Sequence, residues 1–175
     1  MTSKKLLLHV CCAPCASAVI EKLCAEYQLT LFYFNPNIYP EAEYFLRLES
    51  VQKLADRHAL ELLMLPYEPD PWRQIVQQYS NEPEGGRRCE LCFAYRLARA
   101  AAQAKNGYDG FATTLSISPH KNLKQINQAG KSAAQKHGVK FFDFNFQDLY
   151  PRSVELSNTL GLYRQKHCGC IYTQI

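Results

Sequence analysis

The sequence predicts an α/β fold built on a doubly wound, mostly parallel sheet of five strands. The first observation behind this prediction is that short apolar runs, of the length of buried strands, alternate along the chain with longer segments. The second is that apolar residues in the longer segments recur at helical spacing. Strands that alternate with helices imply right-handed crossovers and a parallel sheet covered on both faces, which is a Rossmann-like arrangement.

Five apolar runs are predicted to form the strands: residues 6–10, 30–34, 60–65, 110–115 and 139–144. Six segments are predicted to form helices: residues 14–27, 41–58, 71–79, 89–105, 122–137 and 153–160. Pro14 suits the first position of a helix, and Gly138 and Gly161 follow segments where a helix should end.

The length of 175 residues, with no internal repeat, predicts a single domain over residues 1–175 with its own core. We expect residues 1–145 to form the sheet core and residues 146–175 a C-terminal extension. The N-terminal residues imitate a signal peptide poorly, because His9, Pro14 and three cysteines interrupt the apolar run. No stretch approaches the roughly 20 apolar residues that span a bilayer, so we expect a cytoplasmic protein without a membrane partner.

Seven of the eight cysteines fall into three clusters that are far apart in the sequence. The clusters are Cys11, Cys12 and Cys15; Cys89 and Cys92; and Cys168 and Cys170. The eighth, Cys24, is on the apolar face of a predicted helix and is interpreted as core packing. This density of thiols in a cytosolic chain indicates metal binding or redox chemistry rather than structural disulfides.

The predicted topology brings the first cluster to a ligand-binding position. In open parallel sheets, ligands bind beyond the carboxyl ends of the strands, near the switch in strand order. Cys11 and Cys12 follow the first predicted strand, Asn37 follows the second, and residues 116–120 follow the fourth. Because no glycine-rich loop follows the first strand, we expect a ligand other than a bare phosphate there.

Thiols at helix N-termini suit metals, because the helix dipole favours the thiolate that a metal requires. We therefore expect lowered pKa values for two pairs: Cys12 with Cys15, and Cys89 with Cys92. The residues alone leave three kinds of site open. A [4Fe–4S] cluster takes four thiolates, zinc could take the same two pairs, and a third possibility is a redox site made of thiols alone.

The third cluster, Cys168-Gly169-Cys170, is near the C-terminus on a segment that we expect to be mobile. Two cysteines separated by one glycine can form a strained, labile disulfide, which would suit an electron-relay dithiol. The alternatives are a further pair of metal ligands or an inert tail.

Candidates for substrate contacts come from the same strand ends. Ser116, His120 and Lys121 follow the fourth predicted strand, Asn37 follows the second, and Tyr39 could stack on a base. The net charge of +4 permits a polyanionic partner without requiring one. The basic residues near the cysteines are either a phosphate-binding rim or ordinary solvated helix faces.

Five motifs, in order and across nearly the whole chain, carry a resemblance to a known family. They are LLLHVCCAPC, YFNPNIYP with EY after it, RRCELCFAYRL, FATTLSISPHKN and YRQKHCGC. With these motifs the sequence resembles the cobalamin-independent epoxyqueuosine reductases. The resemblance implies an adenine-nucleotide hydrolase-like fold, in agreement with the predicted sheet. It also implies an enzyme that reduces epoxyqueuosine in tRNA to queuosine.

The resemblance further implies a [4Fe–4S] cluster with an additional iron beside it. The implied cluster ligands are Cys11, Cys12, Cys89 and Cys92. Cys168 and Cys170 would be a redox-active disulfide, and Cys15, where some relatives have an acidic residue, could ligate the second iron. We also expect the basic rim to bind the anticodon stem-loop of tRNA, an electron donor to act on the site, and His120 or Tyr39 to supply a proton.

Two other functions share some of these features. An ATP-dependent tRNA sulfur-transfer enzyme has the same general fold and uses paired cysteines, but it needs a phosphate loop, and residues 10–13 are a poor one. A zinc-stabilised RNA-binding module would use the same thiols as a structural site without catalysis.

Overall fold

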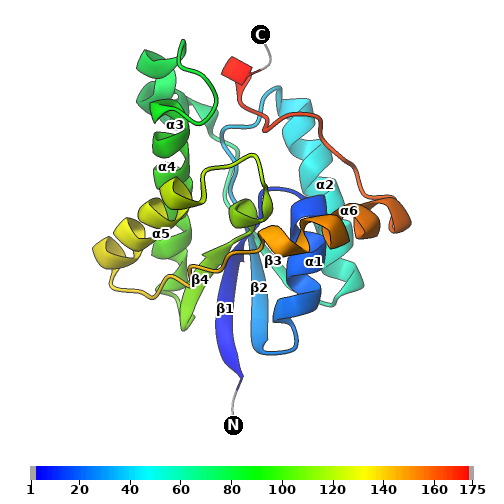
Figure 1. The fold of residues 1–175 in the computed structure, drawn as a ribbon. Helices are drawn as coiled ribbons and strands as arrows, with labels where there is room; N and C mark the ends of the chain where they lie inside the picture. The colour runs from blue at the N-terminus through cyan, green and yellow to red at the C-terminus, as the bar shows by residue number, and fades with distance from the viewer. Residues whose placement is uncertain (1–2, 174–175) are drawn as a thin grey trace.

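The structure is a computed structural model that describes residues 3–173. Its centre is a four-stranded parallel sheet with the strand order β3-β2-β1-β4 (Figure 1). The strands are β1 (Lys4–His9), β2 (Tyr27–Tyr33), β3 (Glu61–Met64) and β4 (Gly110–Thr113). The first three strands extend the sheet in one direction and β4 is added on the other side of β1. The strand order therefore switches between β1 and β4, where proteins of this class bind ligands.

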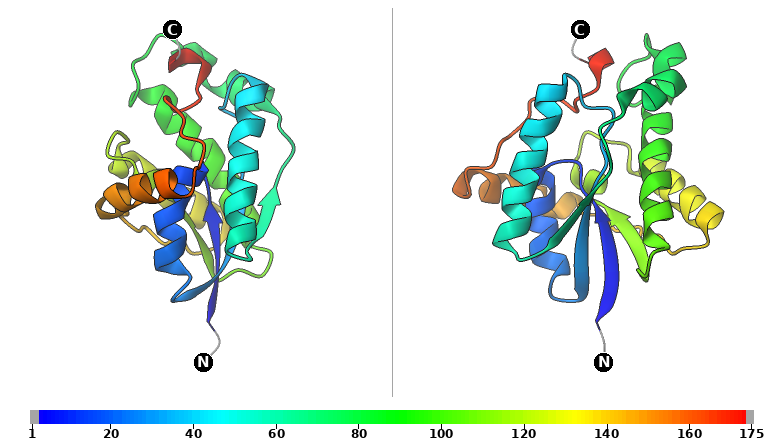
Figure 2. Two further views of the ribbon diagram at one scale, coloured as in Figure 1. Left: turned by 90° about the vertical axis from the view of Figure 1, so that its right-hand side faces the viewer. Right: turned by 180° about the vertical axis from the view of Figure 1, so that it is seen from behind.

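Helices cover both faces of this sheet, as Figures 1 and 2 show. The α-helices are α1 (Ala13–Leu23), α2 (Glu41–Arg57), α3 (Pro69–Val76), α4 (Arg87–Ala104), α5 (Leu123–His137) and α6 (Tyr150–Thr159). Short 3₁₀ helices are η1 (Gln77–Tyr79), η2 (Thr114–Ile117), η3 (Gln147–Leu149) and η4 (Ile171–Thr173). None of the helices within residues 3–173 combines the length and the apolar character needed to cross a bilayer.

The core follows from the alternation of side chains along β1. Leu6 and Leu8 face one side, where they pack in a cluster with residues of α1 and α2. Leu7 faces the other side and packs with residues of α4 and α5. All three leucines are fully buried, and burying each contributes about 1.5–3 kcal/mol to stability. The predicted α/β architecture is confirmed.

The predicted fifth strand at residues 139–144 does not form. Within the described residues this segment makes one isolated parallel bridge to the sheet, between Phe111 and Phe141. Phe142 and Phe144 instead pack edge-on against the ring of Tyr27. The apolar run was therefore misread: two backbone hydrogen bonds with Phe111 and aromatic packing, rather than a full ladder of backbone hydrogen bonds, hold it against the sheet.

The first helix is shorter than the sequence predicts. It ends at Leu23, Cys24 is the residue that follows it, and Tyr27 already begins β2. Cys24 is exposed, so its interpretation as core packing was wrong. Its spacing from the buried residues Val19 and Ile20 is helical, but it lies one position beyond the end of the helix.

His9, the last residue of β1, joins the carboxyl ends of three strands. Its Nδ1 atom lies 2.9 Å from Oγ1 of Thr113 at the end of β4, and Nε2 lies 3.2 Å from the carbonyl oxygen of Phe34 beyond β2. Burial, aided by the charge of Arg96, lowers the pKa of His9 to about 3. The ring is therefore neutral at physiological pH, and its two contacts give it a structural role at the ends of the strands.

A test of the packing between α5 and the segment after it uses Gly130. A Cβ atom at this position would lie 2.4 Å from ring atoms of Phe141. Alanine in a helix is usually more stable than glycine by roughly 0.5–1 kcal/mol. Because overpacking typically costs more than that, we expect Gly130→Ala to lower the free energy of unfolding by about 1–2 kcal/mol in urea denaturation.

The control for this test is Ser132→Ala, on an exposed position of the same helix, which should change the free energy of unfolding little. A Gly130→Ala protein at least as stable as the unsubstituted protein would contradict the packing described here.

Candidate metal centre

Three cysteines lie together between β1 and α1. Cys11 is two residues beyond the end of β1, Cys12 directly precedes α1, and Cys15 is in the first turn of that helix. Among the residues described, their three Sγ atoms form a group in which all lie within 4.8 Å of one another. Those of Cys11 and Cys12 are 3.9 Å apart. Thiolates grouped in this way could hold a metal ion.

Thr114, the residue after β4, positions Cys11. The backbone N–H of Cys11 donates to Oγ1 of Thr114 at 3.2 Å, and the Sγ atom of Cys11 lies 3.4 Å from the same oxygen. This contact joins the ends of β1 and β4. The three thiols thus lie at the switch in strand order, where the sequence analysis expects the ligand.

The thiols do not share the lowered pKa values predicted from helix N-termini. Hydrogen bonds from Cys12 and Cys15 hold the pKa of Cys11 well below its usual range, although burial opposes this. The hydrogen bond to Cys11 raises the pKa of Cys12 to about 12. Hydrogen bonds to both neighbours, together with burial, raise the pKa of Cys15. Proton sharing among packed sulfur atoms outweighs the helix dipole, so Cys11 loses its proton first when no metal is bound.

The second cluster is in the first turns of α4. Sγ of Cys89 accepts a hydrogen bond from the backbone N–H of Gly85 at 3.2 Å, and Sγ of Cys92 lies 3.9 Å from a terminal nitrogen of Arg96. Burial raises the pKa of Cys89, so the lowered value predicted for this residue was wrong as well. Both cysteines line a cavity of about 440 Å³, whose lining also includes Cys11 and Cys15.

The third cluster reaches the same cavity from the C-terminal segment, which runs past α2 to the end of the molecule where the strands point (Figures 1 and 2). Cys170 forms an antiparallel bridge with Ile38. The backbone N–H of Tyr39 donates to the carbonyl oxygen of Gly169 at 2.8 Å. The sequence predicts a mobile segment here, whereas backbone hydrogen bonds hold it beside the cavity.

Cys168 and Cys170 are free thiols in this structure. Burial raises the pKa of Cys170 to about 11. Cys170 packs in one apolar cluster with Cys92 and Trp72, and Cys168 contacts this cluster from its edge. The C-terminal pair is therefore adjacent to the second cluster, while its redox role stays a prediction.

Positive charge surrounds the thiols. Arg96 is buried and donates to Oδ1 of Asn35 at 2.5 Å, and its Nε atom has no hydrogen-bond partner in the part of the chain that the structure describes. Within residues 3–173, neither Arg96 nor the buried Arg88 forms an ion pair with a carboxylate. Burial would lower the pKa of Lys121, but nearby thiolates, those of Cys11 first, outweigh it and raise the pKa. The cavity thus favours an anionic occupant.

The predicted substrate residues divide into two groups. Asn37, His120 and Lys121 line the cavity. Tyr39 is 42% exposed and Ser116 is buried with its hydroxyl donating to the carbonyl oxygen of Thr113, and neither is among the described lining residues. The roles of all five in substrate binding stay predictions.

Sequence reasoning missed several residues of the cavity. Gln165 donates from Nε2 to Sγ of Cys12 at 2.8 Å, and Arg47, Trp72 and Arg96 also line the cavity. Gln165 and Arg96 lie inside the YRQKHCGC and RRCELCFAYRL motifs, which was a signal for their importance but not for their orientation. Arg47 and Trp72 lie outside these motifs and had no such signal. The spacing of residues along a helix gives the face on which a residue lies, but it does not reveal which distant part of the chain that face contacts.

The comparisons with known proteins agree with the resemblance carried by the motifs. The family model described as "Epoxyqueuosine reductase QueH" matches residues 6–175. This chain belongs to that family. A relative of the same name from Thermotoga maritima is 41% identical over 175 residues, which cover 96% of this chain and 89% of the relative. A relative from Acinetobacter baylyi, also of that name, is 38% identical over 97% of this chain and 80% of its own length.

A solved structure shares the fold. It is described as a predicted subunit of tRNA methyltransferase from Methanocaldococcus jannaschii, and it superimposes with a TM-score of 0.55 over 87% of this chain and 74% of its own. At 14% identity the likeness shows the fold alone. It agrees with the α/β fold that the sequence predicts.

The protonation of the first cluster predicts an unusual pH dependence in metal-free protein. Since the pKa of Cys11 is depressed, its thiolate persists below the pH at which ordinary thiols become protonated. The exposed Cys24 has a raised pKa, so its reactivity should fall steadily as the pH decreases from about 9. Alkylation by iodoacetamide, followed residue by residue with mass spectrometry, should therefore favour Cys11 over Cys24 increasingly toward about pH 6. Parallel pH profiles for the two cysteines would contradict this account.

Proposed function

We propose that this chain is an epoxyqueuosine reductase, an oxidoreductase that removes the epoxide oxygen of epoxyqueuosine in tRNA and leaves the cyclopentene of queuosine. The reaction consumes two electrons and two protons and releases the oxygen as water. The observation that carries the proposal is that cysteines from three distant segments line a single cavity in a member of this family.

The cofactor we propose is a [4Fe–4S] cluster with an adjacent iron ion. The proposed cluster ligands are Cys11, Cys12, Cys89 and Cys92, with Cys15 as a ligand of the adjacent iron. Three features of the site fit such a group: the close Sγ atoms of the first cluster, a cavity of about 440 Å³, and the buried guanidinium groups of Arg88 and Arg96, which have no carboxylate partner among the described residues. When bound, the cluster supplies one-electron transfer and the iron supplies a Lewis acid that can act on an epoxide oxygen.

The protein's own groups would handle charge and protons. Lys121 and Arg96 hold positive charge beside the thiolates, which favours an anionic centre and disfavours loss of its ligands. His120 is exposed on the lining of the cavity and is the proposed proton donor to the departing oxygen. The buried His9 is neutral and fully hydrogen-bonded, so it holds the strand ends rather than transferring protons.

The C-terminal pair matches the electron demand of the reaction. Oxidation of the Cys168 and Cys170 dithiol to a disulfide releases two electrons and two protons, which is what one epoxide consumes. The two thiols lie next to Cys92 in the same apolar cluster, which supports transfer between them and the proposed cofactor. An external electron donor would then return the disulfide to the dithiol.

A tRNA substrate is consistent with the positive charge on the lining of the cavity. Lys121 and Lys166 line it, and the whole chain carries a net charge of +4. Lysines of this kind bind phosphates of the anticodon stem-loop, while the modified base leaves its stack to enter the cavity. Action on tRNA implies that the protein works in the cytoplasm.

The two alternatives from the sequence analysis are not favoured. The relatives described above match over nearly the full chain, and they are named epoxyqueuosine reductases rather than sulfur-transfer enzymes or zinc proteins. The start of α1 also presents Cys12 and Pro14 where a nucleotide-binding loop would need glycines.

Turnover of the natural substrate tests the proposed function. Anaerobically prepared, chemically reduced protein should convert epoxyqueuosine in isolated tRNA to queuosine, measured by mass spectrometry of the digested nucleosides. Cys89→Ala removes a proposed cluster ligand and should lower the rate by at least about 100-fold. The control is Cys24→Ala, because Cys24 is exposed and outside the cavity, and it should keep the full rate. A Cys89→Ala protein as active as the control would refute the ligand assignment, and no conversion by the unsubstituted protein would refute the function.

A further inference from the structure

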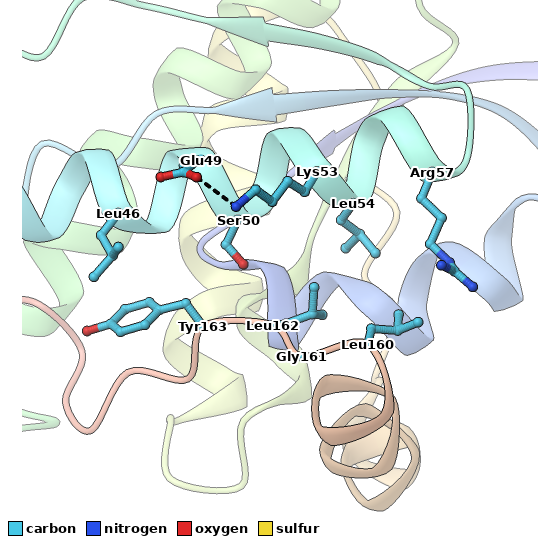
Figure 3. A pocket seen from close by; sticks show the side chains of 10 residues that line it. All are labelled: Leu46, Glu49, Ser50, Lys53, Leu54, Arg57, Leu160, Gly161, Leu162 and Tyr163. Atoms are coloured by element: carbon cyan, nitrogen blue, oxygen red, sulfur yellow. Dashed lines mark ion pairs between the residues drawn. The ribbon is translucent and has the colours of Figure 1, made fainter.

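The segment that carries Cys168 and Cys170 has little regular structure of its own. Helix α6 ends at Thr159 and the short η4 begins at Ile171, so the intervening residues depend on contacts with other parts of the chain. Figure 3 shows residues Leu160 to Tyr163 of this segment running beside α2. A groove of about 460 Å³ lies between them, and beside it Leu160 and Leu162 pack against the core.

Beyond this groove, Arg47 of α2 holds the segment directly. Its two terminal nitrogens donate to consecutive backbone carbonyl oxygens, those of His167 and Cys168, each at 3.2 Å. The Arg47 side chain is only 3% exposed. A buried guanidinium is permanently charged, so its hydrogen bonds to these carbonyls are charge-assisted and shielded from water.

A carboxylate fixes the orientation of this guanidinium. Oε1 of Glu43, one turn earlier on α2, accepts from Nε of Arg47 at 2.7 Å. Oε2 of the same carboxylate accepts from the hydroxyl of Tyr163 at 2.7 Å. Glu43 and Arg47 together therefore bind the C-terminal segment at two points, on either side of Gln165.

The turn between the two cysteines fits closely against the same arginine. Gly169 has a φ of +97°, and a Cβ atom there would lie 2.9 Å from Cγ1 of Ile38 and 3.2 Å from a terminal nitrogen of Arg47. Nδ2 of Asn37 donates to the carbonyl oxygen of Cys168 at 3.4 Å. The backbone of the dithiol is thus fixed by Arg47 from α2 and by the residues that follow β2.

We infer that Arg47 is a positioning residue that holds the Cys168–Cys170 dithiol in its reduced geometry at the cavity. Four observations support this role. Arg47 is buried, it donates to two consecutive backbone carbonyls, Glu43 orients its guanidinium, and it contacts the turn at Gly169. The inference deepens the proposed function, because the dithiol is the proposed two-electron source. It assigns to α2 control over how readily that dithiol becomes a disulfide.

Lysine should not replace Arg47 in holding the segment, because three nitrogens of the planar guanidinium donate at the same time to Glu43, His167 and Cys168. An ammonium group carries its three donors on a single nitrogen, so it cannot reach two successive carbonyls and a carboxylate in one plane as a guanidinium does. In Arg47→Lys the segment should leave its site more often. Since the bound segment holds both thiols free, its release should favour the disulfide.

The first measurement is alkylation of the metal-loaded full-length protein by iodoacetamide under anaerobic conditions. In Arg47→Lys, Cys168 and Cys170 should react at least about tenfold faster, the factor expected for loss of one charge-assisted hydrogen bond. Cys24, far from the segment in sequence and exposed, is the internal reference and should react at its normal rate. The matched control is Arg57→Lys on the exposed part of the same helix, which should change neither rate.

The second measurement separates positioning from packing. Glutathione disulfide converts the dithiol to a disulfide and is itself reduced to two molecules of glutathione, so the equilibrium constant can be measured from the oxidised fraction. Arg47→Lys should shift this constant toward the protein disulfide by about tenfold, and Arg57→Lys should leave it unchanged. Tyr163→Phe removes the hydroxyl that donates to Glu43, so it should shift the equilibrium constant in the same direction by a smaller factor. This variant replaces Arg47→Lys in the measurement if Arg47→Lys does not fold.

Three results would overturn the inference. One is an equilibrium constant within twofold of the unsubstituted value, even if alkylation is faster. Another is faster alkylation of every cysteine alike, which would mean general destabilisation. The third is an unchanged alkylation rate. None of these readouts uses epoxyqueuosine, so a failure of the proposed function leaves this test intact, and its failure leaves the turnover test intact.

Discussion

The thiol cavity depends on how the carboxyl end of β1 is held between its two neighbours. The neutral, buried ring of His9 contacts Thr113 at the end of β4 and Phe34 after β2. These contacts fix the end of β1, which leads to the first cluster, relative to the two neighbouring strands. The hydrogen bond from the backbone N–H of Cys11 to Oγ1 of Thr114 adds a further link between the ends of β1 and β4. Because α1 begins immediately afterwards, Cys12 and Cys15 have little freedom once β1 is fixed. The remaining thiols are brought to this fixed group by longer parts of the chain.

Electrostatics explains why the site suits an anionic centre. Sulfur atoms this close cannot all be ionised without a metal, so in its absence the proton leaves Cys11 while Cys12 and Cys15 keep theirs. A metal reverses this order by replacing the shared protons. The guanidinium groups of Arg88 and Arg96, together with Lys121, then gain the negative partners that the described residues do not otherwise supply. The charges of the protein and the chemistry proposed for it are therefore mutually consistent.

Local patterns predicted much of this protein. Apolar spacing located the helices and four strands, and the position of Cys11 after the first strand located the group of three close thiols. The errors arose where distant contacts decide the structure. The run at residues 139–144 packs its aromatic rings on Tyr27 instead of completing a strand. The C-terminal pair is held by Ile38 and Arg47, more than 100 residues earlier, and no local pattern reveals such a partner. Thiol pKa values also depend on neighbours that only the fold brings together.

The central claim is that cysteines of the first two clusters hold one iron–sulfur centre. Anomalous diffraction at the iron absorption edge, from crystals of anaerobically reconstituted protein, tests it most directly. We expect several iron atoms inside the cavity, bonded to the sulfur atoms of Cys11, Cys12, Cys89 and Cys92. A single zinc ion held by one cluster, or iron bound away from α4, would contradict it.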